Sequence, residues 1–412
     1  MFNRQNKRPF GRSSGFGNQR PGANRFGSQG RPRFGGKAQP RSRNGESKID
    51  ISKLVVKAIK LEDEKPFVPT FTYTTLPVDN KLKENILKKG YTNPTPIQDM
   101  VIPHVLMGKD VVGIANTGTG KTGAFLIPLV EKVIAKKNEQ ILIMCPTREL
   151  ATQIQEELRS LVIGLNIHSV CAVGGMSIGK QISEMRYHNN FVIGTPGRLK
   201  DLMERGFFKP QVFSTVVLDE ADRMLDMGFL ADMKLILGKM LPNRQTLFFS
   251  ATMSKEIEVL VHSFLKSPIM IKIKTGETAK SIDQDIVRIG GKDKITVLHD
   301  LLISPGFHKV LVFGRTKHGV ERLSETLIKR GFKAGSIHGN KNQAKRNRAL
   351  TEFKDGRVSV LVATDVAARG IDVPDVTHVI NFDLPTTYED YVHRIGRTGR
   401  GTKRGKALTL VD

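Results

Sequence analysis

Short apolar runs alternate with longer amphipathic stretches from about residue 70 to the end of the chain. Each run is continuous in apolar residues, as strands buried on both faces of a parallel sheet are. The stretches between them, of roughly ten to fifteen residues, predict helices. The predicted strands form two series, 111–115, 141–145, 191–195, 215–219 and 246–250, then 310–313, 359–364, 377–381 and 407–411. The predicted helices lie between them, as at 317–330. This alternation predicts an α/β fold with parallel sheets.

The two series of strands indicate two domains in tandem. A polar stretch without periodicity, KTGETAKSID at 274–283, separates them, and we expect the hinge there. A chain of 412 residues also exceeds what one hydrophobic core usually supports. We therefore predict a first domain at 49–274, a linker at 275–283 and a second domain at 284–412.

Residues 1–48 differ in composition from the rest of the chain. They hold twelve Lys or Arg residues against a single acid, Glu46, a net charge of +11. Gly, Arg and Phe dominate and aliphatic residues are scarce, so the segment cannot bury enough surface to offset its ordering entropy. We predict a disordered basic tail whose Arg and Phe side chains contact phosphates and unpaired bases. A purely solubilising extension is the alternative.

The overall charge points to a polyanionic partner. The chain carries +25, of which +14 remains without residues 1–48, and nucleic acid is the expected partner. No apolar run approaches the ~18 residues of a membrane span, so we expect no membrane association. Two cysteines are too few for a disulfide framework or a Cys-rich zinc site, so we expect no structural metal. Without an apolar signal segment at the start, cytoplasmic localisation is expected.

A glycine-rich segment at 115–122, ANTGTGKT, follows a predicted strand and opens a predicted helix. Backbone N–H groups of such a loop surround phosphate oxygens, Lys121 reaches the β and γ phosphates, and the Thr122 hydroxyl can ligate magnesium. The strict pattern begins with Gly where this loop has Ala. The glycines of 118–123 also fit a dinucleotide fingerprint, but the next strand does not end in the acidic residue that such a site needs. A nucleoside triphosphate site is favoured, with dinucleotide binding as the alternative.

An acidic tetrapeptide, DEAD at 219–222, follows the strand 215–219. Its side chains are expected at the carboxyl edge of the sheet, beside the phosphate loop. Asp219 there can reach the metal, and Glu220 can orient and deprotonate an attacking water. Alone, such a tetrapeptide is more typical of a solvated helix start. The buried strand and the phosphate loop favour catalysis.

Three arginines occur in HRIGRTGR at 393–400. A basic surface patch is one interpretation. The other is that they supply what the first domain lacks, a cation that stabilises the γ-phosphate in the transition state, an effect worth roughly 10³–10⁵ in rate. In that case hydrolysis requires the two domains to close.

These motifs together resemble those of the DEAD-box RNA helicases. In chain order they are Thr95–Gln98, Ala115–Thr122, Pro146–Leu150, Gly174–Gly175, Thr195–Arg198, Asp219–Asp222, Ser250–Thr252, Gln343 with Arg346, Ala363–Asp365, Arg369–Asp372 and His393–Arg400. The loop of that family normally begins with Ala, although Asn116 stands where Gln is commoner. The resemblance implies two RecA-like domains with ATP and Mg²⁺ between them and RNA across both. It also implies an RNA-stimulated ATP hydrolase that unwinds short duplexes locally.

The resemblance further assigns residues to the ATP site. Gln98 would recognise adenine, and Tyr73, or alternatively Phe71, would stack on it. The phosphates would lie on Ala115, Thr117, Gly118, Thr119, Gly120, Lys121 and Thr122. Thr122 and Asp219 would bind magnesium. The remaining assignments are Asp372 at the ribose, Arg397 and Arg400 as arginine fingers, and His393 as the link from the acidic motif to the nucleotide and the other domain.

The resemblance assigns RNA contacts as well. They are Pro146, Arg148, Gly175, Thr195 and Arg198 in the first domain, and Gln343, Arg346 and Thr364 in the second. Such residues meet phosphate and ribose, so binding should be largely independent of sequence. Ser250 and Thr252 would couple domain closure to strand separation through Asp222. Ribosomal or RNA-decay assemblies are further candidate partners.

Two other functions stay open from the sequence. A passive RNA chaperone could act through the basic tail alone, and a DNA-directed ATPase of the same superfamily would share the phosphate loop and the arginines. Gln98 and the full acidic tetrapeptide favour RNA, and stimulation of ATP hydrolysis by RNA but not by DNA distinguishes these functions.

Overall fold

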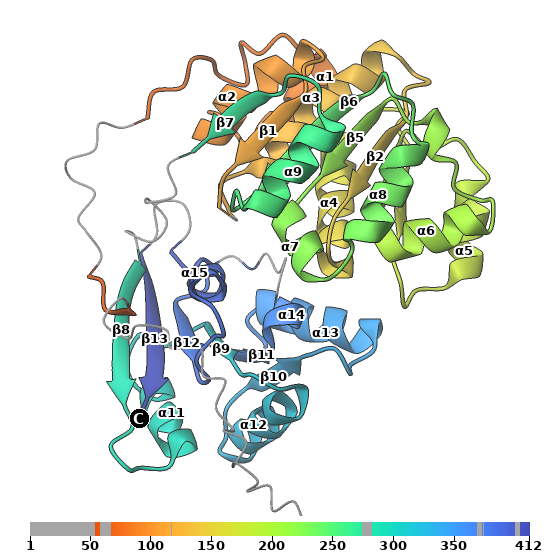
Figure 1. The fold of residues 1–412 in the computed structure, drawn as a ribbon. Helices are drawn as coiled ribbons and strands as arrows, with labels where there is room; N and C mark the ends of the chain where they lie inside the picture. Colours follow the sequence, from red (N-terminus) through yellow and green to blue (C-terminus); the bar gives the residue numbers. More distant parts are fainter. Residues whose placement is uncertain are drawn as a thin grey trace, which may run out of the picture. The chain divides into compact units, whose positions relative to one another are not determined.

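In the computed structural model, the chain forms two α/β lobes, each built on one parallel sheet (Figure 1). The structure describes residues 54–57, 67–116, 118–273, 282–368, 373, 375–399 and 404–412. The predicted tail, Thr117, Asp372, Arg400 and most of the predicted linker lie outside these ranges. None of the helices within these ranges has the length and apolar composition of a membrane span. The predicted α/β fold with two parallel sheets is confirmed.

The first lobe has a seven-stranded sheet in the order β3-β4-β2-β5-β6-β1-β7, with every neighbouring pair parallel. Its strands are β1 (Val111–Ile114), β2 (Ile141–Met144), β3 (Ser169–Ala172), β4 (Phe191–Gly194), β5 (Thr215–Leu218), β6 (Gln245–Ser250) and β7 (Ile269–Lys272). The five predicted strands correspond to β1, β2, β4, β5 and β6. The two strands absent from the prediction, β3 and β7, form the edges of the sheet and are only partly buried.

Helices cover both faces of this sheet (Figure 1). One face packs against α1 (Asn80–Lys88), α2 (Pro96–Leu106), α3 (Lys121–Ala135) and α4 (Arg148–Leu161). The other packs against α5 (Ile178–Met185), α6 (Pro196–Glu204), α7 (Ala221–Asp226), α8 (Leu230–Lys239) and α9 (Lys255–Phe264). Successive residues of a strand serve opposite faces, as Phe248 and Phe249 in β6 do, which accounts for the continuous apolar runs.

The second lobe has a six-stranded parallel sheet in the order β10-β11-β9-β12-β13-β8. The strands are β8 (Ile282–Arg288), β9 (Val310–Phe313), β10 (Ala334–Ile337), β11 (Val360–Ala363), β12 (His378–Asn381) and β13 (Gly405–Val411). The helices are α11 (Lys294–Leu302) and α12 (Lys317–Lys329) on one face, with α13 (Gln343–Lys354), α14 (Asp365–Ala368) and α15 (Tyr388–Ile395) on the other. The edge strands β8 and β10 are again the ones that the apolar pattern did not predict.

One short segment departs from the expected division into domains. Residues 54–56, expected within the first domain at 49–274, contact the second sheet. Val56 forms an antiparallel bridge with Gln284 of β8, and Leu54 is fully buried among residues of the second lobe. The last two residues of the predicted linker, 282 and 283, belong to β8.

A pair of glycine substitutions tests the packing of the first lobe. A Cβ on Gly194, at the end of β4, would lie 2.5 Å from the backbone oxygen of Ala172 and 3.0 Å from Leu199 Cγ. Because a backbone carbonyl in a sheet cannot move aside, Gly194→Ala should lower the free energy of unfolding by about 1–3 kcal/mol in urea titrations. In exposed helical Gly238, where a Cβ meets nothing within 4 Å, Ala should instead raise it by about 0.5–1 kcal/mol. Equal effects of the two substitutions would contradict this account of the packing.

Candidate functional site

The residues expected to carry chemistry in the first lobe lie at the carboxyl ends of its strands. The phosphate loop follows β1, Pro146 follows β2 by one residue, Thr195 follows β4, Asp219 follows β5, and Ser250 ends β6. Because parallel strands all end at the same edge of the sheet, segments distant in sequence meet there. This edge is the candidate site.

The side-chain amide of Gln98, in the first turn of α2, is held against the phosphate loop. Its Oε1 accepts hydrogen bonds from the Thr95 backbone N–H at 2.8 Å and from the Tyr73 hydroxyl at 2.8 Å. Its Nε2 donates to the Gly120 carbonyl at 3.1 Å. Gly120 has φ +95°, and a Cβ there would lie 2.8 Å from Gln98 Nε2, so only glycine fits this approach. The contacts fix the amide beside the loop.

The environment of Tyr73 does not suit the adenine-stacking role expected for it. The side chain is fully buried, and its hydroxyl is committed to Gln98. Burial also raises the pKa of the Tyr73 hydroxyl well above its usual range. A ring without an exposed face cannot stack on a base, so Tyr73 here orients Gln98 instead. Phe71, the alternative, is half-buried and meets the Tyr73 ring edge-to-face, with ring centroids 6.4 Å apart.

The phosphate loop is closed on itself by its own polar side chains. Lys121 is buried, and its Nζ donates to the Ala115 carbonyl at 2.8 Å. The Thr119 hydroxyl donates to the Asn116 carbonyl at 2.8 Å. Lys121 is therefore a buried cation whose hydrogen-bond partner here is a neutral carbonyl oxygen at the mouth of the loop.

Asp219 is a buried acid close to that cation. Burial raises the pKa of its carboxyl from the ordinary 3.8 to about 7, Lys121 lowers it in part, and neighbouring Glu220 raises it further. Its Oδ1 accepts from the Glu220 backbone N–H at 3.0 Å. A buried carboxylate with so little compensation is an environment that a divalent cation would relieve. The oxygen donors Asp219 and Thr122 thus suit Mg²⁺, which prefers oxygen ligands.

Glu220 has an unusual backbone conformation. Its φ and ψ are 50° and 51°, in the left-handed region that few residues other than glycine adopt. Its side chain is buried, and the residue directly precedes α7. Strain of this kind concentrates at functional sites, where the surrounding structure holds it in place.

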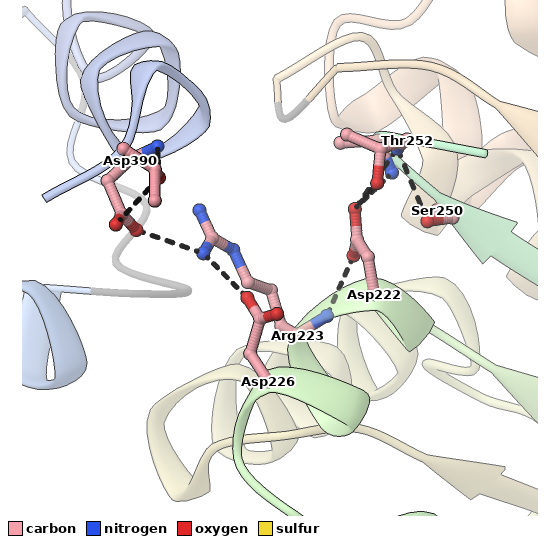
Figure 2. Close-up of polar contacts among 8 residues, drawn as sticks. Asp222, Arg223, Asp226, Ser250, Thr252 and Asp390 are labelled. Carbon is pink, nitrogen blue, oxygen red and sulfur yellow. Dashed lines mark hydrogen bonds and ion pairs between the residues drawn. The ribbon is translucent and has the colours of Figure 1, made fainter. Parts of the chain in front are cut away.

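Asp222 gathers the residues expected to couple the site to domain closure (Figure 2). Its Oδ2 accepts from the Ala251 N–H at 3.0 Å, the Thr252 N–H at 3.1 Å and the Thr252 hydroxyl at 3.2 Å. The Thr252 N–H also donates to Ser250 Oγ at 3.3 Å. The turn after β6 is therefore fixed by a single carboxylate from α7.

A cavity of about 410 Å³ collects most of the expected RNA contacts. Its lining is Pro146, Thr147, Arg148, Glu149, Gly174, Thr195, Gly197, Arg198, Met227, Phe229 and Arg346. Three arginines make it a basic site. Gly175 lies directly against Arg148, since a Cβ at that glycine would be 1.9 Å from Arg148 Nη1. Of the expected contacts, Gly175, Gln343 and Thr364 do not line the cavity themselves.

Sequence reasoning missed Glu149, which contacts two of these residues. It is 3% exposed, and its Oε1 accepts from Gln343 Nε2 at 3.0 Å and pairs with Arg346 Nη2 at 2.9 Å. The sequence offered one signal for it, because an acidic residue follows Arg148 in a motif whose other residues suit phosphate binding. Glu149 ties α13 of the second lobe to α4 of the first.

Two candidate residues of the second lobe, His393 and Arg397, lie in α15 or just after it. Arg397 and His393 line a small cavity that also includes Arg223 and Asp390, and Arg223 Nη1 lies 3.4 Å from Asp390 Oδ1 (Figure 2). Sequence reasoning also missed Arg394.

Arg394 is 2% exposed and anchors α15 to the second sheet. It donates to both carboxylate oxygens of Asp365, at 2.5 and 2.7 Å, to Asn381 Oδ1 at 3.1 Å and to the Asp383 carbonyl at 2.6 Å. Asp365 directly follows Thr364, so this ion pair links α15 to the residue next to an expected RNA contact.

No group of three or more His, Cys, Asp or Glu residues able to hold a metal ion occurs within the ranges that the structure describes.

Comparison with known proteins gives matches over both lobes. Residues 95–260 match the family described as DEAD/DEAH box helicase, and residues 293–402 match the helicase conserved C-terminal domain. The chain is 47% identical over 337 residues to the ATP-dependent RNA helicase CshA of Listeria monocytogenes, an alignment covering 81% of this chain. It spans 65% of the length of CshA.

Solved structures are similar as well. A DEAD box protein from the hyperthermophile Methanococcus jannaschii is 38% identical, with a TM-score of 0.51 over 84% of this chain and 94% of that one. Mss116p, with its NTE and C-tail deleted and bound to ssRNA and AMP-PNP, is 30% identical, with a TM-score of 0.76 over 86% and 77% of the two chains.

The raised pKa of Asp219 predicts how stability depends on pH. Between about pH 4 and 7 the folded protein keeps a proton on Asp219 that the unfolded chain releases, so the free energy of unfolding falls as pH rises through this window. Asp219→Asn, which keeps the acceptor for the Glu220 N–H, should match the parent near pH 4. At pH 8 it should be more stable, on the order of 1 kcal/mol or more. Urea unfolding at both pH values measures this, with Asp226→Asn, an exposed acid of the same region, as control. A constant difference across the pH range would contradict the assignment.

Proposed function

Because the chain belongs to the DEAD-box helicase family, we propose that it is an ATP-dependent RNA helicase. It binds RNA largely without sequence preference, hydrolyses ATP when RNA is bound, and separates short duplexes or remodels RNA–protein complexes locally. The observation that carries the proposal is the shared strand-end edge, which brings together the phosphate loop with buried Lys121, the buried acid Asp219, and Pro146 and Thr195 of an arginine-lined cavity. The similarity to CshA and to Mss116p, whose structure holds ssRNA and AMP-PNP, supports it.

ATP binds on the phosphate loop, 115–122. There, phosphate oxygens replace the Ala115 carbonyl as partner of Lys121, which gives that buried cation a counter-charge. Gln98 uses one of its two Nε2 hydrogens on Gly120, and the other remains for an acceptor on the adenine edge. Phe71 is the aromatic with ring surface left to stack on the base. Asp372, outside the described residues, is assigned to the ribose.

Thr122 and Asp219 would hold Mg²⁺, which when bound would neutralise charge on the phosphates. The chain's own residues do the rest. Glu220, fixed by its left-handed backbone, orients a water and accepts its proton on the carboxylate. Arg397 and Arg400 stabilise the charge that develops on the γ-phosphate, and His393 lies beside Arg397 in the same small cavity.

RNA occupies the basic cavity through its phosphates and riboses. Arg148, Arg198 and Arg346 supply the positive charge, and Glu149 fixes Arg346 at the cavity wall. Pro146, Gly175, Thr195, Gln343 and Thr364 are assigned as further contacts. Contacts of this kind carry no base code, so many RNA sequences should bind.

The carboxylate of Asp222 links the two ligand sites. It joins the acidic motif to Ser250 and Thr252, and closure of the lobes on ATP and RNA is transmitted through it to the RNA strand. The protein acts in the cytoplasm, and ribosomal or RNA-decay assemblies remain candidate partners.

The direct test is ATP hydrolysis with and without single-stranded RNA or DNA, beside separation of a short RNA duplex. RNA should stimulate hydrolysis and DNA should not. Glu220→Gln should retain ATP and RNA binding but reduce hydrolysis by about tenfold to a hundredfold, the lower range for loss of a general base. Glu204→Gln, an exposed glutamate at the end of α6, serves as the matched control and should behave like the parent.

Near-normal turnover by Glu220→Gln would remove that residue from the mechanism. Equal stimulation by DNA would favour the DNA-directed ATPase, and RNA binding without any hydrolysis would favour the passive chaperone.

Deletion of residues 1–48 tests the role assigned to the basic tail. The deletion removes a charge of +11 but no residue assigned to the ATP site. The apparent KM for RNA should therefore rise, and RNA affinity should depend less steeply on salt because fewer counterions are released. Turnover at saturating RNA should stay the same. RNA titrations at two salt concentrations measure these effects. Equal affinities and equal salt slopes would leave the tail only a solubilising role.

A further inference from the structure

A short segment from before the first lobe docks on the edge of the second. Residues 54–57, the dark-orange piece beside β8 in Figure 1, lie at the outer strand of the six-stranded sheet. On its other side β8 pairs with β13 in parallel. The segment therefore contacts the one side of β8 that the sheet itself leaves unpaired.

The backbone contact is an antiparallel bridge at a single residue. The Val56 N–H donates to the Gln284 carbonyl at 3.0 Å, and the Gln284 N–H donates to the Val56 carbonyl at 2.8 Å. An exposed strand edge binds extended peptides in this way, with main-chain hydrogen bonds for affinity and side-chain pockets for selectivity.

The pocket at this edge is filled by Leu54. The side chain is fully buried in an apolar cluster with Ile282 and Ala407 of the sheet and Tyr391 and Ile395 of α15. By contrast, Val55 is 46% exposed. Leu54 is thus the side chain of the segment that this cluster buries, and residues of α15 form part of the cluster.

Gln284 connects the docked segment to α15 through a second route. Its backbone pairs with Val56, while its side-chain Oε1 accepts a hydrogen bond from the Tyr391 hydroxyl at 3.1 Å. Tyr391 is itself fully buried. Leu54 and Gln284 therefore hold the same face of α15, the helix that carries His393 and Arg394 and leads into Arg397.

We propose that residues 54–56 are a latch, a strand of the chain's own that docks between β8 and α15 and positions α15 for ATP hydrolysis. Leu54 is the anchor and acts as a positioning residue, since it belongs to one apolar cluster with Tyr391 and Ile395 of α15 and is assigned to neither the ATP site nor the RNA site. The role in hydrolysis rests on the proposed function, because it acts through Arg397. The docking of the segment on the second lobe is independent of the proposed function.

The test compares four substitutions in the full chain. Leu54→Ser removes the anchor, Val55→Ser makes the same change on the adjacent exposed residue, and Leu54→Met keeps the apolar volume. Val56→Pro is an independent variant that removes the N–H donated to Gln284 and leaves Leu54 in place.

Docking is measured by amide hydrogen exchange without nucleotide or RNA. Loss of a buried leucine side chain should speed exchange in β8 and α15 by about tenfold or more in Leu54→Ser and in Val56→Pro. Val55→Ser and Leu54→Met should match the parent. Strands of the first lobe, which take no part in the cluster, should keep their protection and show that the variants are folded. Unchanged protection of β8 and α15 in both disruptive variants overturns the latch.

Positioning is measured by ATP hydrolysis at saturating ATP and RNA. Leu54→Ser should lower kcat, on the order of tenfold, with the KM for ATP unchanged, because a displaced arginine weakens the transition state more than the bound substrate. Lost protection with unchanged kcat overturns the positioning role. A parent protein that does not hydrolyse ATP refutes the proposed function instead, and the exchange experiment still decides the docking.

Discussion

The parallel direction of every strand in each sheet is the constraint on which the site depends. Because all the strands of a sheet end at one edge, the phosphate loop after β1, the acids after β5 and the turn after β6 are neighbours, although long segments separate them in sequence. The helices that return the chain between strands bury both faces of the sheet and leave this edge open. The polar groups assigned to the chemistry therefore lie at this edge, where the sheet has no apolar face that must be covered.

That arrangement collects several unfavourable features at one site. Asp219 is buried with a pKa raised to about 7, Lys121 is buried against a neutral carbonyl, and Glu220 adopts a left-handed backbone. Burial of charged groups and a left-handed backbone each cost stability. The Asp222 carboxylate, in contrast, accepts hydrogen bonds on both oxygens, from the turn after β6 and from the Arg223 N–H. The costly groups are those to which the proposed function assigns ATP, Mg²⁺ and the water that Glu220 orients, and the satisfied carboxylate is the one to which it assigns coupling.

The apolar pattern predicted the central strands because these are buried on both faces, and it missed the edge strands β3, β8 and β10 because they alternate or are short of large apolar residues. The edge strand β7 was also missed, although its sequence IMIK is apolar. Motifs that lie on continuous segments were predicted equally well, among them the phosphate loop at 115–122 and the acidic tetrapeptide at 219–222. What the sequence could not supply were contacts made only by tertiary structure. One such feature is the burial that excludes Tyr73 from stacking. Two others are the ion pair of Glu149 with Arg346 and the ion pair of Arg394 with Asp365, which join residues far apart in the chain.

The last of these contacts bears on how the second lobe delivers its arginines. The proposed role of Arg397 requires an accurately placed backbone. In this protein other residues meet that requirement. Arg394 donates hydrogen bonds to Asp365, Asn381 and the Asp383 carbonyl, and these bonds fix one face of α15. The cluster around Leu54 and Tyr391 fixes another face. With α15 held on both faces by groups that take no part in the reaction, Arg397 just beyond its end is placed by the fold.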